Sequence, residues 1–261
     1  MPKSTQRLAG KVAMITGGGA GIGAAASTLF CGEGAAVAIV DADEQALERT
    51  REAILRAHPD ARVMCLAADV SQAGRAQEAV AKCLAAWKTL DVLVNNAAMR
   101  NYLPAADVGP EDWQGIVGVN LAGMSNYCRA ALPALRASGA GAIVNVSSCY
   151  AVTGRRGMAL YDATKAAQLA FTRSLAFEEA AHGVRANAIC PGSTLTDFHV
   201  ARATVAGKSV EQLKAERNTT SLIGRWASPD EIAWPIVWLA SSEASFITGT
   251  TLMVDGGLHI M

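Results

Sequence analysis

Three side chains in one short stretch of the chain carry the groups that proton transfer needs. Ser148 brings a hydroxyl, Tyr161 a phenol and Lys165 an ammonium. Tyr161 and Lys165 stand at positions i and i+4 of a helical pattern, so both side chains leave the same helix face. A tyrosine has a pKa of about 10, and a neighbouring cation lowers it. We therefore expect this pair to exchange a proton with a substrate hydroxyl or carbonyl.

Ser148 follows the apolar run at 142–146, which is typical of a buried strand. The carboxyl ends of parallel strands face the crevice where open α/β sheets bind ligands. We therefore expect the Ser148 hydroxyl to lie in such a crevice. A tyrosine and a lysine at this spacing are also common on solvated helix faces, so the pattern needs independent support.

A glycine-rich loop near the start of the chain supplies that support. The run Thr16-Gly-Gly-Gly-Ala-Gly-Ile-Gly23 follows an apolar segment and precedes a helical pattern that begins at Ile22. We expect Gly17 to form a tight turn, Gly21 to admit a phosphate, and Gly23 to let helix and strand pack closely. The N–H groups of the first helical turn would then face a pyrophosphate. A plain glycine-rich turn is the alternative interpretation of these residues alone.

Asp41 ends the second apolar run, about twenty residues after the loop, where dinucleotide-binding folds place an acid. A carboxylate there accepts hydrogen bonds from the adenosine ribose, and it would repel the 2′-phosphate of NADP. Ala42 and the loop residues 18–20 offer no cation for such a phosphate. We therefore expect NAD as the cofactor, with Asp43 as the N-cap of the next helix.

Together these motifs resemble the short-chain dehydrogenases/reductases. The resemblance rests on the glycine loop, the segment Asn95-Asn96-Ala97, Asn120, and the set of Ser148, Tyr161 and Lys165, and it extends from about Lys11 to Gly257. It implies an α/β fold, a single Rossmann-type doubly wound domain over residues 1–261 with a parallel seven-stranded sheet and helices on both faces. Ala98 stands where the family usually has glycine, a departure of one methyl group.

The resemblance also implies a role for each matching residue. Tyr161 would be the general acid/base, Ser148 would polarise the substrate oxygen, and Lys165 would bind the nicotinamide ribose. Asn120 would hold a water that links Lys165 to solvent, which makes it the fourth expected catalytic residue. The expected cofactor-binding residues are Gly17, Gly21, Ile22, Gly23, Asp41, Asp69, Val70, Asn96, Ala97, Tyr161, Lys165, Pro191, Gly192, Thr194 and Thr196.

The composition limits the kinds of partner that the protein is expected to bind. The 261 residues carry 23 basic and 23 acidic side chains, and no Lys/Arg run exceeds two, so we expect neither nucleic acid nor an anionic membrane as a partner. No apolar run reaches the roughly 20 residues of a membrane span. Unpaired cysteine spacing and a polar N-terminus favour a cytoplasmic protein. The four histidines lack the spacing of metal ligands, so we expect no metal.

Periodicity predicts the elements that must position these residues. Strands are expected at 12–15, 36–40, 62–68, 90–94, 142–146, 184–189 and 250–254, and helices at 22–31, 44–58, 71–87, 110–137, 161–179, 210–217 and 228–240. Ser71 is expected to cap its helix and Pro133 to kink the long one.

Residues 194–223 have weak periodicity and suggest a mobile substrate lid. The helix at 161–179 is apolar on more than one face, which favours a homo-oligomer, either a tetramer or a dimer.

The residues expected at the substrate are two of the catalytic residues and a set of positions that vary with substrate in the resembled family. They are Ser148, Tyr161, Arg100, Tyr102, Tyr150, Arg155, Arg156, Met158, Phe198 and His199. Arginine forks match carboxylate, sulfonate or phosphate groups, so Arg100, Arg155 and Arg156 favour an anionic or highly hydroxylated alcohol. Two solvated loop arginines at 155 and 156 are the alternative.

These observations predict an NAD-dependent oxidoreductase that transfers a hydride between a small-molecule substrate and the nicotinamide. The substrate would be a secondary alcohol, a sugar, a hydroxy acid or a diol. An NADP-dependent carbonyl or 3-oxoacyl-(acyl carrier protein) reductase is the first alternative, although the chain lacks the basic residues expected for a carrier protein. A non-catalytic NAD-binding regulator is the second, and the intact set of Ser148, Asn120, Tyr161 and Lys165 argues against it.

Overall fold

One parallel sheet of seven strands forms the centre of the molecule, in the order β3-β2-β1-β4-β5-β6-β7. The computed structural model describes residues 6–216 and 221–261. The strands are β1 (Val12–Thr16), β2 (Ala36–Asp41), β3 (Val63–Ala67), β4 (Val92–Asn95), β5 (Ala142–Val146), β6 (Arg185–Pro191) and β7 (Thr251–Val254). The predicted α/β fold with a parallel seven-stranded sheet is therefore confirmed.

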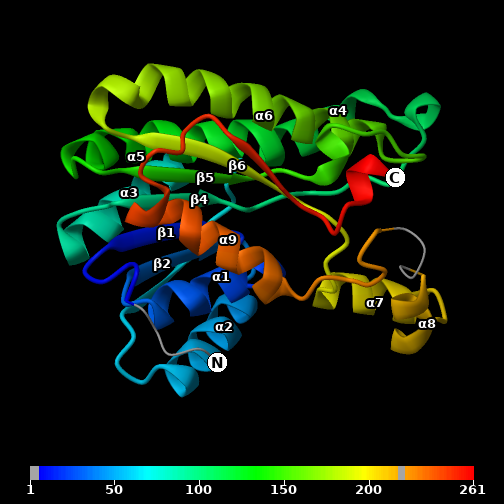
Figure 1. Cartoon of the computed structure of the whole chain (residues 1–261), viewed down its shortest axis with the longest axis horizontal. Helices are drawn as coiled ribbons and strands as arrows, with labels where there is room; N and C mark the ends of the chain where they lie inside the picture. Colours follow the sequence, from blue (N-terminus) through cyan, green and yellow to red (C-terminus); the bar gives the residue numbers. More distant parts are fainter. Residues whose placement is uncertain (1–5, 217–220) are drawn as a thin grey trace.

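Helices cover both faces of this sheet (Figure 1). The helices are α1 (Gly21–Gly32), α2 (Glu44–Ala57), α3 (Ala73–Trp87), α4 (Pro110–Val117), α5 (Met124–Ala137), α6 (Ala159–Glu179), α7 (Asp197–Val205), α8 (Val210–Ala215) and α9 (Pro229–Ala240). Side chains of α1, α2 and α9 pack in one core cluster, and side chains of α3, α5 and α6 pack in another. The arrangement is a doubly wound Rossmann-type fold.

Strand alternation explains why the sheet needs two helical layers. Ala13 and Ile15 of β1 belong to the cluster that contains α1 and α9. Val12 and Met14 of the same strand belong to the cluster that contains α3 and α5. Successive side chains of a strand point to opposite faces, so an apolar run buries both faces only when both are covered.

The edge formed by the carboxyl ends of the strands positions the site. Neighbours of β1 are β2 on one side and β4 on the other, so the chain reverses its direction of winding there. Open α/β sheets bind ligands in the crevice beside such a switch point. The glycine loop after β1, Asp41 at the end of β2 and the segment after β4 all meet at this edge.

The predicted continuous helix at 110–137 is wrong. A π-helical segment, Gly118–Gly123, separates α4 from α5. Within it the backbone carbonyl of Asn120 accepts a hydrogen bond from Gln168 Nε2 at 2.7 Å, so a distant side chain partners this carbonyl. Such one-turn π segments interrupt α-helices where a local contact competes with the regular ladder, often at functional sites. Pro133 lies inside α5.

Two further expectations about helices need correction. Ser71 does not cap α3, because its backbone N–H donates to Asp69 Oδ1 and the helix begins at Ala73 with Gln72 as N-cap. Helix α7 was not predicted, since its sequence is weakly periodic. Helix α8 was predicted to reach Arg217, which lies outside the described residues.

Within residues 6–216 and 221–261, no helix combines the length and the apolarity that crossing a bilayer requires.

Candidate active site

The glycine loop is held in shape by one asparagine. Asn96 Nδ2 donates to the carbonyl oxygens of Thr16, at 3.1 Å, and Gly17, at 2.9 Å. Gly17 has φ +62°, and a Cβ there would lie 2.8 Å from Ala97 Cα, so glycine is required on both counts. Helix α1 follows with no side-chain cap and no acidic residue in its first turn. Its first N–H groups are therefore available to an anion.

A groove of about 810 Å³ runs along this loop. The predicted cofactor residues that line it are Gly17, Gly21, Ile22, Asp41, Asp69, Val70, Asn96, Ala97 and Thr196. Asp41 is oriented at one end by two backbone donors, Gly19 N at 3.0 Å and Asp43 N at 3.2 Å. Asp43 caps α2 as predicted, accepting from Ala46 N at 3.0 Å. An acid at one end and a helix N-terminus beside the groove fit a dinucleotide.

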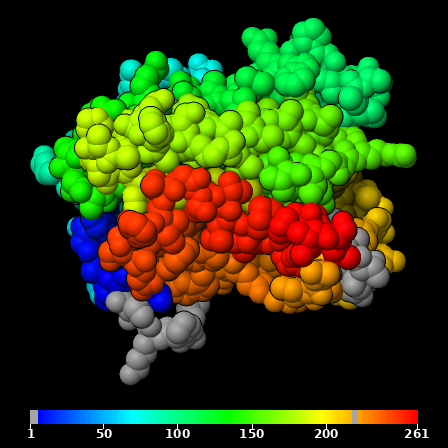
Figure 2. Space-filling model, turned by 45° about the horizontal axis from the view of Figure 1, so that its top comes forward, coloured from blue at the N-terminus to red at the C-terminus, as the bar shows by residue number. Residues whose placement is uncertain are grey.

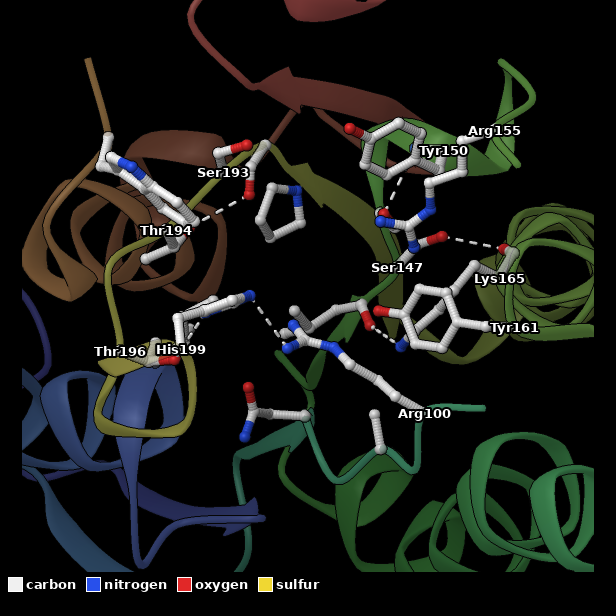
Figure 3. Close-up of a pocket in the computed structure, with 18 of the residues that line it drawn as sticks. Arg100, Ser147, Tyr150, Arg155, Tyr161, Lys165, Ser193, Thr194, Thr196 and His199 are labelled. Carbon is white, nitrogen blue, oxygen red and sulfur yellow. Dashed lines mark hydrogen bonds between the residues drawn. The ribbon is translucent and has the colours of Figure 1, made fainter. Parts of the chain in front are cut away.

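A second cavity of about 130 Å³ adjoins this groove, and residues such as Ile22 and Thr196 line both. The predicted residues that line this second cavity are Ile22, Asn96, Arg100, Tyr102, Ser148, Tyr150, Arg155, Tyr161, Lys165, Pro191, Gly192, Thr194, Thr196 and His199, and several of them are labelled in Figure 3. Ser148, Tyr161 and Lys165 are thus brought together. Ser147, Ser193 and Trp226 also line this cavity, and no motif in the sequence had marked them.

Lys165 is the most deeply buried cation of the site, with 1% of its surface exposed. Its Nζ donates to the Val146 carbonyl at 2.8 Å and to Gln168 Oε1 at 3.2 Å, and lies 5.6 Å from the centre of the Tyr161 ring. Ser147 Oγ donates to the Lys165 carbonyl at 2.8 Å. Lys165 is therefore fixed in place by β5 and by its own helix, close behind the phenol.

Burial, more than charge, sets the protonation of this pair. Burial first, and the Arg100 guanidinium second, lower the pKa of Lys165 to about 7. Burial raises the pKa of Tyr161, and the cations that oppose this rise are Arg100 and Arg155. The expectation that Lys165 brings the pKa of Tyr161 towards neutral is therefore wrong for this arrangement. Arg100 and Arg155 lower the pKa of Tyr161 instead, against the effect of burial.

Asn120 is fully buried on the π segment and ties three parts of the site together. Its Oδ1 accepts from Met99 N at 2.7 Å, and its Nδ2 donates to the Met99 carbonyl and to Thr164 Oγ1. Gln168 links the Asn120 carbonyl to Lys165 Nζ. Gln168 was not among the residues predicted from the sequence. Its place at i+3 from Lys165, on the same helix face, was the available signal.

The candidate substrate residues divide into two groups. Arg100, Tyr102, Tyr150, Arg155 and His199 line the smaller cavity, and Phe198 lines the adjoining groove. Met158 and Arg156 lie elsewhere. Met158 is buried in a cluster with Ile116, Leu160 and Tyr161, so it supports the phenol from behind. Arg156 is exposed and outside the cavity lining.

Two histidines, His199 of the site and His259 near the C-terminus, are engaged with protein partners. His199 contacts Thr196 Oγ1 through Nδ1 at 3.0 Å and Arg100 Nη1 through Nε2 at 3.2 Å. His259 pairs with Asp255 at 2.7 Å. Across residues 6–216 and 221–261, no group of three or more His, Cys, Asp or Glu side chains is placed to hold a metal ion.

The chain is similar to known proteins over nearly its whole length. A family model described as enoyl-(acyl carrier protein) reductase matches residues 17–259. A short chain dehydrogenase/reductase of Aspergillus oryzae is 36% identical over 256 residues, 97% of each chain. The 2-(S)-hydroxypropyl-CoM dehydrogenase 3 of Xanthobacter autotrophicus is 34% identical, over 97% of this chain and 98% of its own. The structure of L-sorbose reductase from Gluconobacter frateurii, complexed with NADPH and L-sorbose, matches with a TM-score of 0.92 and 30% identity, over 97% of this chain and 98% of that one.

The burial of Lys165 predicts a pH-dependent stability that Lys165→Met should remove. The folded pKa is about 7, against about 10.4 for an unfolded lysine, so between these values the unfolded chain binds one more proton. The wild type should therefore gain stability relative to the variant as the pH rises from 7 towards 10, by at most about 1.4 kcal/mol per pH unit. Urea unfolding of both proteins at several pH values measures this. A pH-independent difference between the two proteins would contradict it.

Proposed function

The chain belongs to the short-chain dehydrogenase/reductase family, and we propose that it is an NAD-dependent dehydrogenase of secondary alcohols. It is an oxidoreductase that acts on hydroxyl or carbonyl groups. The observation that carries the proposal is the Tyr161 phenol, buried beside Lys165 in a cavity that adjoins a dinucleotide-sized groove. We further propose one NAD-binding domain over residues 1–261, with 194–223 as a substrate lid, of which residues 217–220 lie outside the described part of the chain.

In the oxidation direction Tyr161, as phenolate, takes the proton of the substrate hydroxyl. A nicotinamide held in the groove would accept the hydride of the substrate carbon–hydrogen bond as the carbonyl forms. Ser148 Oγ donates a hydrogen bond to the substrate oxygen. Reduction reverses these roles, with the phenol as the acid. Positive charge on Arg100 and Arg155 favours the phenolate, against the burial that disfavours it.

Lys165 and Asn120 support this proton transfer. Lys165 lies behind the phenol and would also bind the nicotinamide ribose. The contact from Gln168 to the Asn120 carbonyl connects the lysine to the π segment. We propose that Asn120 orders the path by which protons reach Lys165 from solvent.

The choice of NAD rests on Asp41. Its carboxylate lines the groove at the end of β2, where it would accept from ribose hydroxyls and repel a 2′-phosphate. An NADP-dependent carbonyl or 3-oxoacyl-(acyl carrier protein) reductase is the second candidate. Two findings favour it, namely the NADPH in the L-sorbose reductase structure and the presence of Arg202 in the groove. A non-catalytic NAD-binding regulator is a remote third candidate.

We also propose that the chain works in the cytoplasm as a homo-oligomer. Phe177 of α6 is 88% exposed, and Phe246, just before β7, is fully exposed. Figure 2 shows α6 beside the C-terminal segment on one face, and a Cβ added at Gly249 would lie 3.6 Å from Ala176 Cβ of α6. Exposed aromatic side chains on adjoining elements are typical of a surface that another subunit covers.

Cofactor preference is tested by titrating the protein with NADH and NADPH and following nicotinamide fluorescence. We expect tighter binding of NADH, and Asp41→Ala should weaken NADH by about 10- to 150-fold, since hydrogen bonds to a charged group contribute about 1.5–3 kcal/mol. Asp43→Ala is the matched control, because this carboxylate caps α2 and does not line the groove. It should cost about 1 kcal/mol of stability and leave the preference unchanged. Tighter binding of NADPH would favour the second candidate.

The role of Tyr161 is tested by Tyr161→Phe. Turnover of NAD with any alcohol substrate should fall by about 10²–10⁴-fold, the usual share of general acid/base catalysis, while NADH binding persists. Tyr127→Phe is the control, because the buried Tyr127 hydroxyl has no hydrogen-bond partner among the described residues. That variant should keep full activity. Normal turnover in Tyr161→Phe would overturn the mechanism.

Light scattering on the purified protein tests the oligomer. We expect a mass of two or four chains, and a double variant with Phe177→Ser and Phe246→Ser should shift the population to smaller species. The loss of two large apolar contacts would weaken an interface without touching the core. A monomeric wild type would contradict this proposal and leave the catalytic one intact.

A further inference from the structure

Arg100 occupies the junction between the two cavities of the site. It lies in the loop after β4 and lines both the cofactor groove and the smaller cavity. Its guanidinium carbon is 5.9 Å from the centre of the Tyr161 ring and 4.9 Å from that of Phe198. In Figure 3 the guanidinium reaches towards His199 on one side and Tyr161 on the other. Arg100 therefore faces the space where a substrate must sit.

The positive charge of Arg100 is not neutralised by the protein. Among the described residues Arg100 forms no ion pair with a carboxylate, and its polar partners are His199 and the Tyr161 hydroxyl. Arg155 differs, because it is paired with Asp162 at 3.0 Å and stacked 3.7 Å over the Tyr150 ring. No Asp or Glu is found among the described residues that line the smaller cavity. The cavity is therefore cationic.

His199 holds Arg100 in position without adding charge. A guanidinium has donors and no acceptor, so Nε2 of His199 must accept the hydrogen bond from Arg100. The ring proton then sits on Nδ1 and donates to Thr196 Oγ1. The ring is further fixed by its packing on Trp226, at 5.1 Å between ring centres. His199 is thus an uncharged residue that positions the guanidinium, and Arg100 keeps N–H donors for a ligand.

A half-buried guanidinium with no counter-ion is costly unless a ligand supplies one. A carboxylate matches the guanidinium fork with two parallel hydrogen bonds. The cavity volume is about 130 Å³, and the nicotinamide must share it because predicted cofactor residues line it too, so the substrate is small. Because Arg100 lies against Tyr161, the anion must be near the reacting hydroxyl.

We propose that the substrate is a small hydroxy acid whose carboxylate binds Arg100, with His199 as the residue that positions the guanidinium. This inference rests on the proposed function, since it places the carboxylate beside the alcohol that Tyr161 deprotonates. It assigns Arg100 alone, of the three arginines that the sequence offered, to the substrate anion. Arg155 is compensated by Asp162, and Arg156 lies outside the cavity lining.

Calorimetric titration of the NADH-loaded protein with butyrate and with butyramide tests the anion site without requiring turnover. The two probes have similar shape and differ in charge. We expect butyrate to bind at least tenfold more tightly, and Arg100→Gln to abolish this difference. Arg56→Gln, an exposed arginine on α2, is the matched control and should leave the difference unchanged. Equal binding of the probes, binding of neither, or a preference that persists in Arg100→Gln would overturn the inference.

Kinetics separate this role from an effect on Tyr161. The substrates are 2- and 3-hydroxybutyrate and their methyl esters, with NADH formation followed by absorbance. Arg100→Gln should lower kcat/KM for the acids by about 100-fold, as for one partner of a buried charge pair, and change the esters little. Arg100→Lys should lie between, because it keeps the charge and loses the fork. Equal losses for acids and esters would show that Arg100 acts on the Tyr161 phenol and would overturn the substrate assignment.

A failure of the proposed function is distinguishable from a failure of this inference, because NADH would then not bind or no alcohol at all would turn over.

Discussion

The site depends on the burial of one cation, the Lys165 ammonium. Taking an ion out of water costs several kcal/mol unless hydrogen bonds replace the lost hydration. The Val146 carbonyl at the end of β5 and Gln168 provide those bonds. Gln168 in turn needs an acceptor for its amide, which it finds in the Asn120 carbonyl. The break in the helix at 118–123 accompanies this chain of contacts, so the lysine and the π segment are parts of one arrangement.

The sequence predicts the sheet and the cofactor loop well because their causes are local. Apolar runs such as 36–40 become buried strands wherever they lie in the chain, and a φ of +62° at Gly17 requires glycine irrespective of distant residues. The π segment could not be predicted, because its hydrogen-bond donor, Gln168, is remote in sequence. Helix α7 could not be predicted either, since its apolar contacts, such as the cluster of Ala203 with Leu213 and Trp226, form between elements.

Which arginines of the site are neutralised by a carboxylate was the feature hardest to predict from the sequence. Arg100, Arg155 and Arg156 are equivalent candidates for a substrate anion when read as residue types. The structure distinguishes them by their partners, because Asp162 neutralises Arg155 and solvent surrounds Arg156. Asp162 stands next to the reactive tyrosine, where a sequence motif assigns it no role. Its ion pair with Arg155 limits the positive charge near Tyr161, which leaves Arg100 as the uncompensated group.

The same contacts that shape the substrate cavity also hold α7 against the loop after β4. Arg100 bonds His199 and lies over Phe198, both from α7, while Arg202 of α7 stacks 3.8 Å over Tyr102 of the loop. In the proposed mechanism the edge of the sheet supplies a rigid base for the hydride chemistry, and these two surface segments supply the selectivity. Loops tolerate substitution far better than a buried sheet. A change at positions 100, 102, 198 or 199 therefore alters the charge and shape of the cavity while the cation at Lys165 and its hydrogen bonds stay in place.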